Sequence, residues 1–184
     1  EQAVPPARVL PADGSASYRL EFAEPLRSVA PEQNVEFHTS LFRYRYTSYT
    51  TSPSVYDYDL ETRQPKLLKQ VEVPGGYDPA RYQVERLDAP APDGARVPVS
   101  LVYRKNLRKA GPQPLLLVGY GAYGYPAEVQ FDATRIPLLD RGVIFAQAHI
   151  RGGADLGKTW HDDGRMLKKR NTFTDFIAAA EHLI

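Results

Sequence analysis

The chain has 184 residues, of which 42% are hydrophobic and 24% are charged, and its formal net charge at neutral pH is +1. These values are typical of a folded protein with a real core, long enough for one domain or for parts of two, and they exclude a general attraction to nucleic acid or anionic membranes. The lack of cysteine excludes disulfides and thiolate metal sites and suits a reducing cytoplasm, although many exported proteins also lack cysteine.

The first part of the chain predicts short strands in which polar and apolar residues alternate. The predicted strands are Tyr18–Phe22, Leu41–Thr47, Val55–Leu60 and Lys66–Val73. Strands of this length and spacing fit a blade or two of a β-propeller. Because no second copy of the unit follows, further propeller repeats would have to lie upstream.

The segment Pro74-Gly-Gly-Tyr-Asp-Pro79 predicts a domain boundary, because its prolines and glycines interrupt the alternation. Compact apolar strands are predicted after it over Val97–Tyr103, Leu115–Gly119 and Val143–His149, with a short helix over Ala133–Asp140. Strands that alternate with helices predict a mainly parallel sheet. We therefore expect two differently built parts, residues 1–73 and residues 74–184.

The last segment predicts an amphipathic helix. It begins at Thr172-Phe-Thr-Asp175, a pattern similar to a capping box. The apolar residues that recur at helical spacing on one face are Phe173, Phe176, Ile177, Ala180, Leu183 and Ile184. No apolar run approaches the roughly 20 residues of a membrane span.

The run Leu115-Leu-Leu-Val118, followed by Gly119-Tyr-Gly-Ala-Tyr-Gly124, indicates a buried strand that delivers a tyrosine to a tight turn. A phenol can donate one hydrogen bond of an oxyanion hole, because it stays protonated at neutral pH. The alternative is that Tyr120 packs against the core at the strand end. None of the eight serines lies in a Gly-x-Ser-x-Gly elbow, so we expect the nucleophile to lie outside this chain.

Other polar residues predict structural roles. His149 and His161 have no serine at a strand-to-helix elbow, so core or surface roles are expected for both. Arg151 is expected to form ion pairs within the fold, and Lys168-Lys-Arg170 to be a solvated face rather than a nucleic-acid site. No histidine pair has metal-ligand spacing, and no phosphate-binding loop occurs, so neither a metal nor a cofactor is predicted.

Six segments occur in an order typical of one enzyme family: Leu68-Lys-Gln-Val-Glu-Val-Pro-Gly-Gly-Tyr-Asp-Pro79, Val97-Pro-Val-Ser-Leu-Val-Tyr-Arg104, Gly119-Tyr-Gly-Ala-Tyr-Gly124, Leu138-Leu-Asp-Arg-Gly142, Arg151-Gly-Gly153 and Leu167-Lys-Lys-Arg-Asn-Thr-Phe173. From about Tyr18 to its end, the chain resembles the oligopeptidase B branch of the prolyl oligopeptidase family of serine peptidases. The resemblance implies the last strands of a β-propeller in residues 1–73 and the opening part of an α/β-hydrolase domain in residues 74–184. It also implies that the catalytic Ser, Asp and His lie beyond Ile184, so that this fragment needs the remainder of its chain for a complete site.

The same resemblance implies roles for three residues. Tyr120 matches the oxyanion-hole donor, and Tyr123 matches an aromatic residue that lines the primary specificity pocket, with loop packing as the alternative. Glu128 matches an acid that pairs with a basic side chain in the neighbouring subsite, with a solvated surface carboxylate as the alternative. Gln130 stands where the family has a second acid, and this departure weakens the expected preference for paired basic residues.

We therefore expect a serine peptidase that cleaves short peptides after Arg or Lys through an acyl-enzyme, without a cofactor and without a nucleic-acid or membrane partner. One alternative is another hydrolase of the same family, such as a proline-specific peptidase, an acylaminoacyl peptidase or an esterase. The other alternative is a non-catalytic interaction module that contains a propeller.

Overall fold

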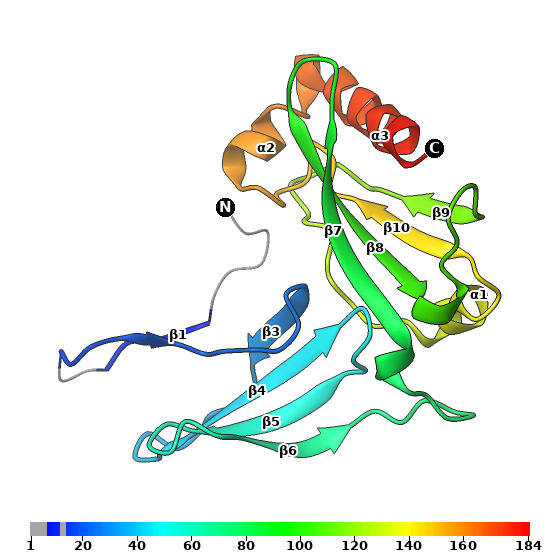
Figure 1. Ribbon diagram of the computed structural model, residues 1–184. Helices are drawn as coiled ribbons and strands as arrows, with labels where there is room; N and C mark the ends of the chain where they lie inside the picture. Colours follow the sequence, from blue (N-terminus) through cyan, green and yellow to red (C-terminus); the bar gives the residue numbers. More distant parts are fainter. Residues whose placement is uncertain (1–6, 12–13) are drawn as a thin grey trace. The chain divides into compact units, whose positions relative to one another are not determined.

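The computed structural model describes residues 7–11 and 14–184, which form two compact units (Figure 1). The N-terminal unit contains the described residues up to Tyr77, together with Val129–Phe131. The C-terminal unit contains Asp78–Glu128 and Asp132–Ile184. The chain first passes between the units inside the segment Pro74–Pro79, and it later returns to the N-terminal unit for three residues that no sequence pattern distinguishes.

A four-stranded antiparallel sheet forms most of the N-terminal unit (Figure 1). Its strands follow one another in chain order: β3 (Arg27–Pro31), β4 (Leu41–Ser48), β5 (Ser54–Asp59) and β6 (Pro65–Gln70). Before them, β1 (Arg8–Val9) pairs with β2 (Tyr18–Arg19). The strands predicted at 41–47, 55–60 and 66–73 are confirmed with shifted ends. Four consecutive antiparallel strands are also the form of one propeller blade.

Tyrosine side chains build the core of this unit. Tyr44 and Tyr46 of β4 are buried, whereas Arg43 and Arg45, which alternate with them, are exposed. The rings of Tyr44 and Tyr56 stack with their centroids 5.4 Å apart. Since successive side chains of a strand point to opposite faces, the period-two pattern of β4 places its aromatic residues on the face that is covered.

Strand β3 was not predicted, because Arg27–Pro31 has no sustained alternation and ends at a proline, as an edge strand can. Asn34 continues its pairing with β4 beyond that proline. The side-chain amide of Asn34 donates to the carbonyl oxygen of Arg43 at 3.0 Å, and the Arg43 amide donates to Asn34 Oδ1 at 2.7 Å. One side chain thus supplies the donor and the acceptor that a further strand residue would have supplied.

A half-buried carboxylate fixes the turn between β4 and β5. Glu24 accepts hydrogen bonds from Tyr46 Oη at 2.5 Å, Ser48 Oγ at 2.6 Å, Thr50 Oγ1 at 2.6 Å and Thr51 Oγ1 at 2.8 Å. Burial by itself raises the pKa of Glu24, but the hydroxyl groups, Ser48 and Thr50 foremost, outweigh it and lower this pKa below the ordinary value. The fold therefore favours the ionised form of the Glu24 carboxylate.

The C-terminal unit contains a second four-stranded sheet in the order β7-β8-β10-β9. Its strands are β7 (Tyr82–Pro90), β8 (Arg96–Arg104), β9 (Leu115–Val118) and β10 (Ile144–Ala148). The three predicted strands of this part are confirmed, and β7 is an additional one. Val97, Val99 and Ala146 at the centre of the sheet are completely buried.

The expectation of a mainly parallel sheet is wrong for the described strands. β7 pairs with β8 and β8 pairs with β10 in antiparallel fashion, and only β10 and β9 are parallel. The turn at Asp93-Gly94 closes a hairpin, which makes its two strands antiparallel. Only the connection from β9 to β10 contains a helix of the kind that a parallel crossover needs.

Short helical segments connect these strands. They are η1 (Pro79–Arg81), η2 (Lys105–Leu107), η3 (Ala133–Arg135), α1 (Ile136–Leu139), α2 (Lys158–Asp162) and η4 (Met166–Lys168). The short helix predicted between β9 and β10 is confirmed, and Gly142 after it has a φ of +83°, as expected for a glycine that ends a helix.

The long helix α3 (Arg170–Leu183) packs against β7 and β8 (Figure 1). The predicted capping box is wrong, because the helix begins earlier and Lys169 precedes it without a side-chain cap. The predicted apolar face is only partly buried: Phe176 and Leu183 pack against the core, whereas Phe173 is 62% exposed and Ile177 is 54% exposed. The buried residues are Thr172, Asp175, Ala178 and Ala179. Small residues let the helix approach the sheet, and the two polar ones have partners described below.

Candidate active site

The residues Gly119–Glu128, which we call the tyrosine loop, follow β9 in the C-terminal unit. The side chains of Tyr120, Tyr123 and Tyr125 are 58%, 82% and 66% exposed. Among the described residues, the Tyr120 side chain therefore does not pack into the core. Tyr123 has a φ of +54°, a conformation that is uncommon for a residue with a side chain and that often accompanies functional loops.

Glycines let the tyrosine loop lie directly on neighbouring backbone. A Cβ atom on Gly121, whose φ is +59°, would lie 2.5 Å from Thr172 Cγ2 and 2.9 Å from the carbonyl oxygen of Arg151. A Cβ atom on Gly152, whose φ is +101°, would lie 2.2 Å from the carbonyl oxygen of Gly121. Gly121 of the tyrosine loop and Gly152 of the segment after β10 are therefore required, because these two segments pack closely against each other.

Two hydrogen bonds fix the first part of the tyrosine loop, and a third contact holds the segment beside it. Lys169 Nζ donates to the carbonyl oxygen of Gly121 at 2.5 Å, and the Gly124 amide donates to the carbonyl oxygen of Gly152 at 3.0 Å. Nδ1 of His161 lies 2.8 Å from the same Gly152 oxygen. His161 is partly buried, so its predicted structural role is confirmed. These contacts hold the backbone beside Tyr120 while leaving its ring in solvent.

Arg151 forms the ion pairs that its sequence position predicted. Its guanidinium contacts Asp175 through Nε at 2.9 Å and Nη2 at 2.5 Å, and Nη1 contacts Asp93 at 2.6 Å. The Arg151 amide also donates to Asp175 at 2.9 Å. Hydrogen bonding to Asp175 is the largest influence that raises the pKa of Arg151, and Asp93 adds to it against the effect of burial. The pair joins α3 to the loop after β10.

His149 has partners that the sequence did not reveal. Its Nε2 lies 2.7 Å from Ser100 Oγ, and its Nδ1 lies 2.8 Å from Asp155 Oδ1. This is the connectivity of a Ser-His-Asp triad. However, Ser100 is 0% exposed in the middle of β8, and the side chains of His149 and Asp155 are each 4% exposed. A substrate cannot reach the hydroxyl group, so the expected core role of His149 is confirmed.

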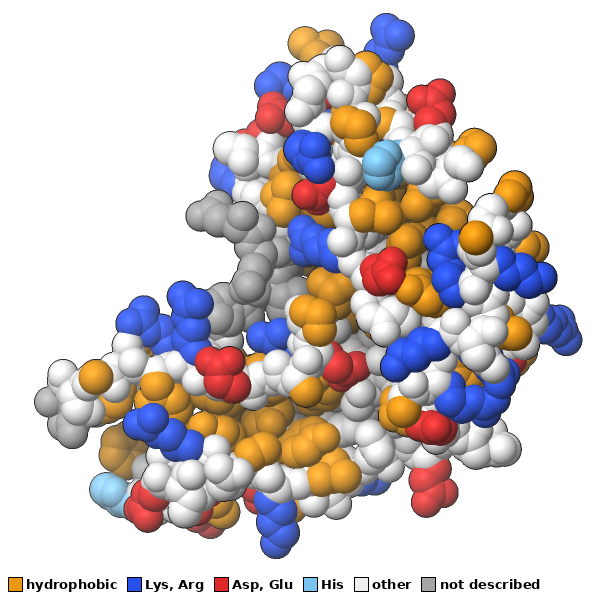
Figure 2. Space-filling model, in the orientation of Figure 1, with side chains coloured by type: hydrophobic (Ala, Val, Ile, Leu, Met, Phe, Trp, Pro, Cys, Tyr) orange, Lys and Arg blue, Asp and Glu red, His pale blue; other side chains and the backbone are white. Residues whose placement is uncertain are grey.

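Glu128 and Gln130 are both exposed near the end of the tyrosine loop. Glu128 belongs to the C-terminal unit, whereas Gln130 belongs to the three-residue return into the N-terminal unit. Tyr120, Tyr123 and Glu128 are therefore three exposed side chains on one connection between β9 and η3. Figure 2 shows hydrophobic side chains among charged ones on one face of the molecule.

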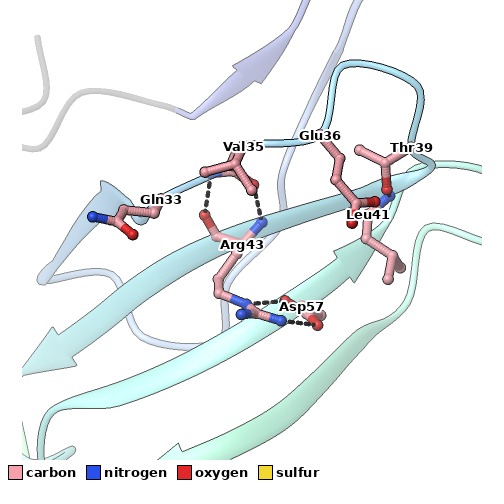
Figure 3. A pocket seen from close by; sticks show the side chains of 8 residues that line it. Gln33, Val35, Glu36, Thr39, Leu41, Arg43 and Asp57 are labelled. Carbon is pink, nitrogen blue, oxygen red and sulfur yellow. Dashed lines mark hydrogen bonds and ion pairs between the residues drawn. The ribbon is translucent and has the colours of Figure 1, made fainter.

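A cavity of about 190 Å³ lies in the N-terminal unit, beside the connection from β3 to β4 (Figure 3). Its lining residues are Gln33, Asn34, Val35, Glu36, Thr39, Leu41, Arg43 and Asp57. Arg43 and Asp57 point toward one another and form two hydrogen bonds of 2.7 and 2.8 Å (Figure 3). Hydrogen bonding to Arg43 lowers the pKa of Asp57. The charges of Arg43 and Asp57 are thus already paired with one another.

Residues 7–11 and 14–184 contain no group of three or more His, Cys, Asp or Glu side chains that could hold a metal ion. No helix within these residues has both the length and the hydropathy of a membrane span.

Comparisons with known proteins show that the chain is similar to peptidases. The model of the prolyl oligopeptidase family matches residues 129–184. Dipeptidyl aminopeptidase BI of Pseudoxanthomonas mexicana is 45% identical over 178 residues, which are 96% of this chain and 24% of that protein. Protease 2 of Moraxella lacunata is 40% identical over 166 residues, which are 90% of this chain and 24% of that protein.

The solved structures that match this chain include two of oligopeptidase B. Oligopeptidase B from Leishmania major matches with a TM-score of 0.82 and 43% identity, over 92% of this chain and 24% of that one. Oligopeptidase B from Trypanosoma brucei, in a closed form with covalently bound antipain, matches with a TM-score of 0.83 and 42% identity over the same shares. The chain thus spans about a quarter of the length of its relatives.

Proposed function

This chain belongs to the prolyl oligopeptidase family, and from that premise we propose that the intact protein is a serine peptidase that cleaves short peptides after Arg or Lys. The observation that carries the proposal is the position of Tyr120, exposed at the start of a loop whose backbone is fixed on both sides. Such a donor is pre-organised for a substrate, since its neighbours need not move when charge develops.

The proposed chemistry assigns Tyr120 the role of oxyanion donor. When a serine hydroxyl attacks the scissile carbonyl, that carbonyl oxygen becomes negative, and the phenol would donate a hydrogen bond to it. The acyl-enzyme then forms as the amine leaves, and water releases the second product. We propose that the Ser, His and Asp of this reaction lie outside these 184 residues, because Ser100 is inaccessible.

The two units correspond to two domains in this proposal. Residues 1–73 would be the last blade or blades of a β-propeller, and residues 74–184 would be the first part of the α/β-hydrolase domain. The meander β3 to β6 supports the first assignment, and the sheet order β7-β8-β10-β9 with one parallel pair supports the second. A propeller that covers the catalytic domain would limit substrates to short peptides.

The proposed preference for basic residues depends on Glu128. A carboxylate in the subsite beside the primary pocket can pair with a guanidinium through two hydrogen bonds. Tyr123 would line the primary pocket, where an exposed ring offers a flat apolar surface. Gln130 lacks the charge of a second acid, so we propose a weaker discrimination between single and paired basic residues than two acids would give.

A second candidate is removal of dipeptides from a free N-terminus. It is favoured by one observation: the relative with 45% identity is named a dipeptidyl aminopeptidase. The two candidates differ in what they require of the substrate, because an aminopeptidase must recognise the free amine. An N-blocked substrate would satisfy the first candidate and not the second.

The test compares four fluorogenic amides with the intact protein: N-blocked Arg, N-blocked Lys, N-blocked Pro and a dipeptide with a free N-terminus. Fastest turnover of the N-blocked basic substrates, together with labelling by a serine-directed phosphonate, would support the main proposal. Preference for the free dipeptide would support the second candidate, and preference for Pro would assign a proline-specific enzyme. No turnover and no labelling would leave a non-catalytic module.

A further inference from the structure

Three buried polar side chains form a continuous line from the sheet to the tyrosine loop. Ser100 Oγ lies 2.7 Å from His149 Nε2, and His149 Nδ1 lies 2.8 Å from Asp155 Oδ1. The same Asp155 oxygen accepts a hydrogen bond from the Ala127 amide at 2.8 Å. The line therefore ends on the backbone one residue before Glu128.

The direction of each bond follows from the donors present. A backbone N–H can only donate, so Asp155 accepts from Ala127, and a carboxylate without a proton must also accept from His149 Nδ1. His149 Nε2 is then the atom that meets the Ser100 hydroxyl group. The indole of Trp160 donates to the His149 carbonyl oxygen at 2.9 Å. These contacts allow one orientation of the imidazole and hence one position of the carboxylate.

Gly153 shows that the surroundings are shaped for Asp155. A Cβ atom on Gly153 would lie 2.6 Å from Asp155 Oδ2 and 2.9 Å from the carbonyl oxygen of Tyr125. The missing side chain leaves room for both the carboxylate and the loop backbone. A line of buried polar groups is not needed for core stability, because apolar groups of similar shape can replace such a network at little cost.

We propose that Asp155, oriented by His149 and Ser100, is a positioning residue that holds the Ala127–Glu128 end of the tyrosine loop, so that Glu128 is presented to the substrate. This inference rests on the proposed role of Glu128 in binding a basic side chain. The other end of the loop is held separately by Lys169 at Gly121. Loss of Asp155 should therefore affect binding through Glu128 far more than stabilisation of the oxyanion by Tyr120.

Kinetics with the intact protein provide the first readout. For a substrate with two basic residues, we expect Asp155→Ala to raise KM roughly tenfold and to change kcat less than about threefold, since one charge-assisted hydrogen bond to the loop is lost. Asp155→Asn should restore much of the loss, because its side-chain oxygen can still accept from Ala127. Asp163→Ala is the matched control, an exposed carboxylate that pairs with Lys168.

Amide hydrogen exchange provides a second readout that does not depend on activity. In Asp155→Ala, exchange should accelerate roughly tenfold or more in the peptide that contains Ala127 and stay unchanged at Gly121. Unchanged exchange at Ala127 would overturn the proposal whatever the kinetics. Faster exchange at Ala127 with an unchanged KM in Asp155→Ala would also overturn the proposal, provided that Glu128→Gln itself raises KM. If Glu128→Gln leaves KM unchanged, the proposed subsite is wrong, and the proposed presentation of Glu128 is wrong with it. The exchange data would still report whether Asp155 holds the loop.

Discussion

At the scale of single residues, Tyr120 and His149 show how differently two promising side chains can be placed. Tyr120 is 58% exposed on a fixed loop, whereas His149 is 3% exposed among hydrogen-bond partners. The tyrosine motif could be interpreted from sequence because its glycines and tyrosines are adjacent. The partners of His149 could not, because Ser100 lies 49 residues away and is brought close only by the pairing of β8 with β10.

The Tyr120→Phe variant of the intact protein should lower kcat by roughly 10²–10³, about 2.7–4 kcal/mol. KM should change little, because the oxyanion exists in the transition state and barely in the bound substrate. The exposed ring is retained, so circular dichroism and melting temperature should match the parent protein. Steady-state kinetics are the measurement, and a kcat within about threefold of the parent would mean that Tyr120 is not the donor.

The two acidic partners of Arg151 should differ in their contribution to stability. Asp175 is completely buried, whereas the Asp93 side chain is 48% exposed. We expect Asp175→Asn to cost about 3–5 kcal/mol, because it leaves a buried guanidinium without its buried charge partner and with only the half-exposed Asp93. Asp93→Asn, the matched control, should cost less than about 1 kcal/mol. Urea unfolding measures both, and equal losses would contradict the importance assigned to burial.

At the scale of the elements, the local sequence pattern predicted the positions of most strands well, but it predicted poorly which neighbours the elements pack against. β4, β5, β8 and β10 have clear alternation or compact apolar runs, and each was found with its ends shifted by at most one residue. β3 lacks such a pattern and depends on its neighbour. Helix α3 was predicted in place, but the burial of Thr172 and Asp175 was not, because their partners lie on another segment: Thr172 donates to the Arg151 carbonyl oxygen and Asp175 accepts from the Arg151 guanidinium.

The turn between β4 and β5 should be sensitive to acid. The pKa of Glu24 in the folded state lies below its ordinary value of 4.5, so its stabilisation is present above that value and is lost as pH falls through the lower, folded-state pKa. At neutral pH we expect Glu24→Gln to cost about 1–3 kcal/mol. The difference from the parent should shrink in urea unfolding below about pH 4.

The exposed residue Glu21 provides the control for that experiment, because Glu21→Gln removes a nearby carboxylate that faces solvent. Its unfolding should follow the parent at each pH. A Glu24→Gln effect of the same size at pH 3 and pH 7 would show that the four hydroxyl groups do not depend on the charge of the carboxylate.

At the scale of the whole molecule, the described residues contain the proposed oxyanion donor, whereas Ser100, the serine that contacts His149, is completely buried. We therefore expect the purified 184-residue chain to release no product from an N-blocked Arg amide, because an acyl-enzyme cannot form without an activated nucleophile. Turnover that survives further purification, with labelling by a serine-directed phosphonate, would contradict this. The intact protein, assayed alongside, is the positive control.

The short return of Val129–Phe131 has a consequence for how such a gene can be cut and recombined. The Phe131 ring packs edge-to-face against Tyr77 at 5.2 Å, and its amide donates to Thr47 Oγ1 at 3.3 Å. Neither unit is therefore encoded by one uninterrupted stretch of DNA. A crossover placed between the codons for Tyr77 and Asp78 would take most of the N-terminal unit from one parent and the three residues Val129–Phe131 of the same unit from the other. Viable chimaeras should be those in which both parents carry compatible residues at these three positions.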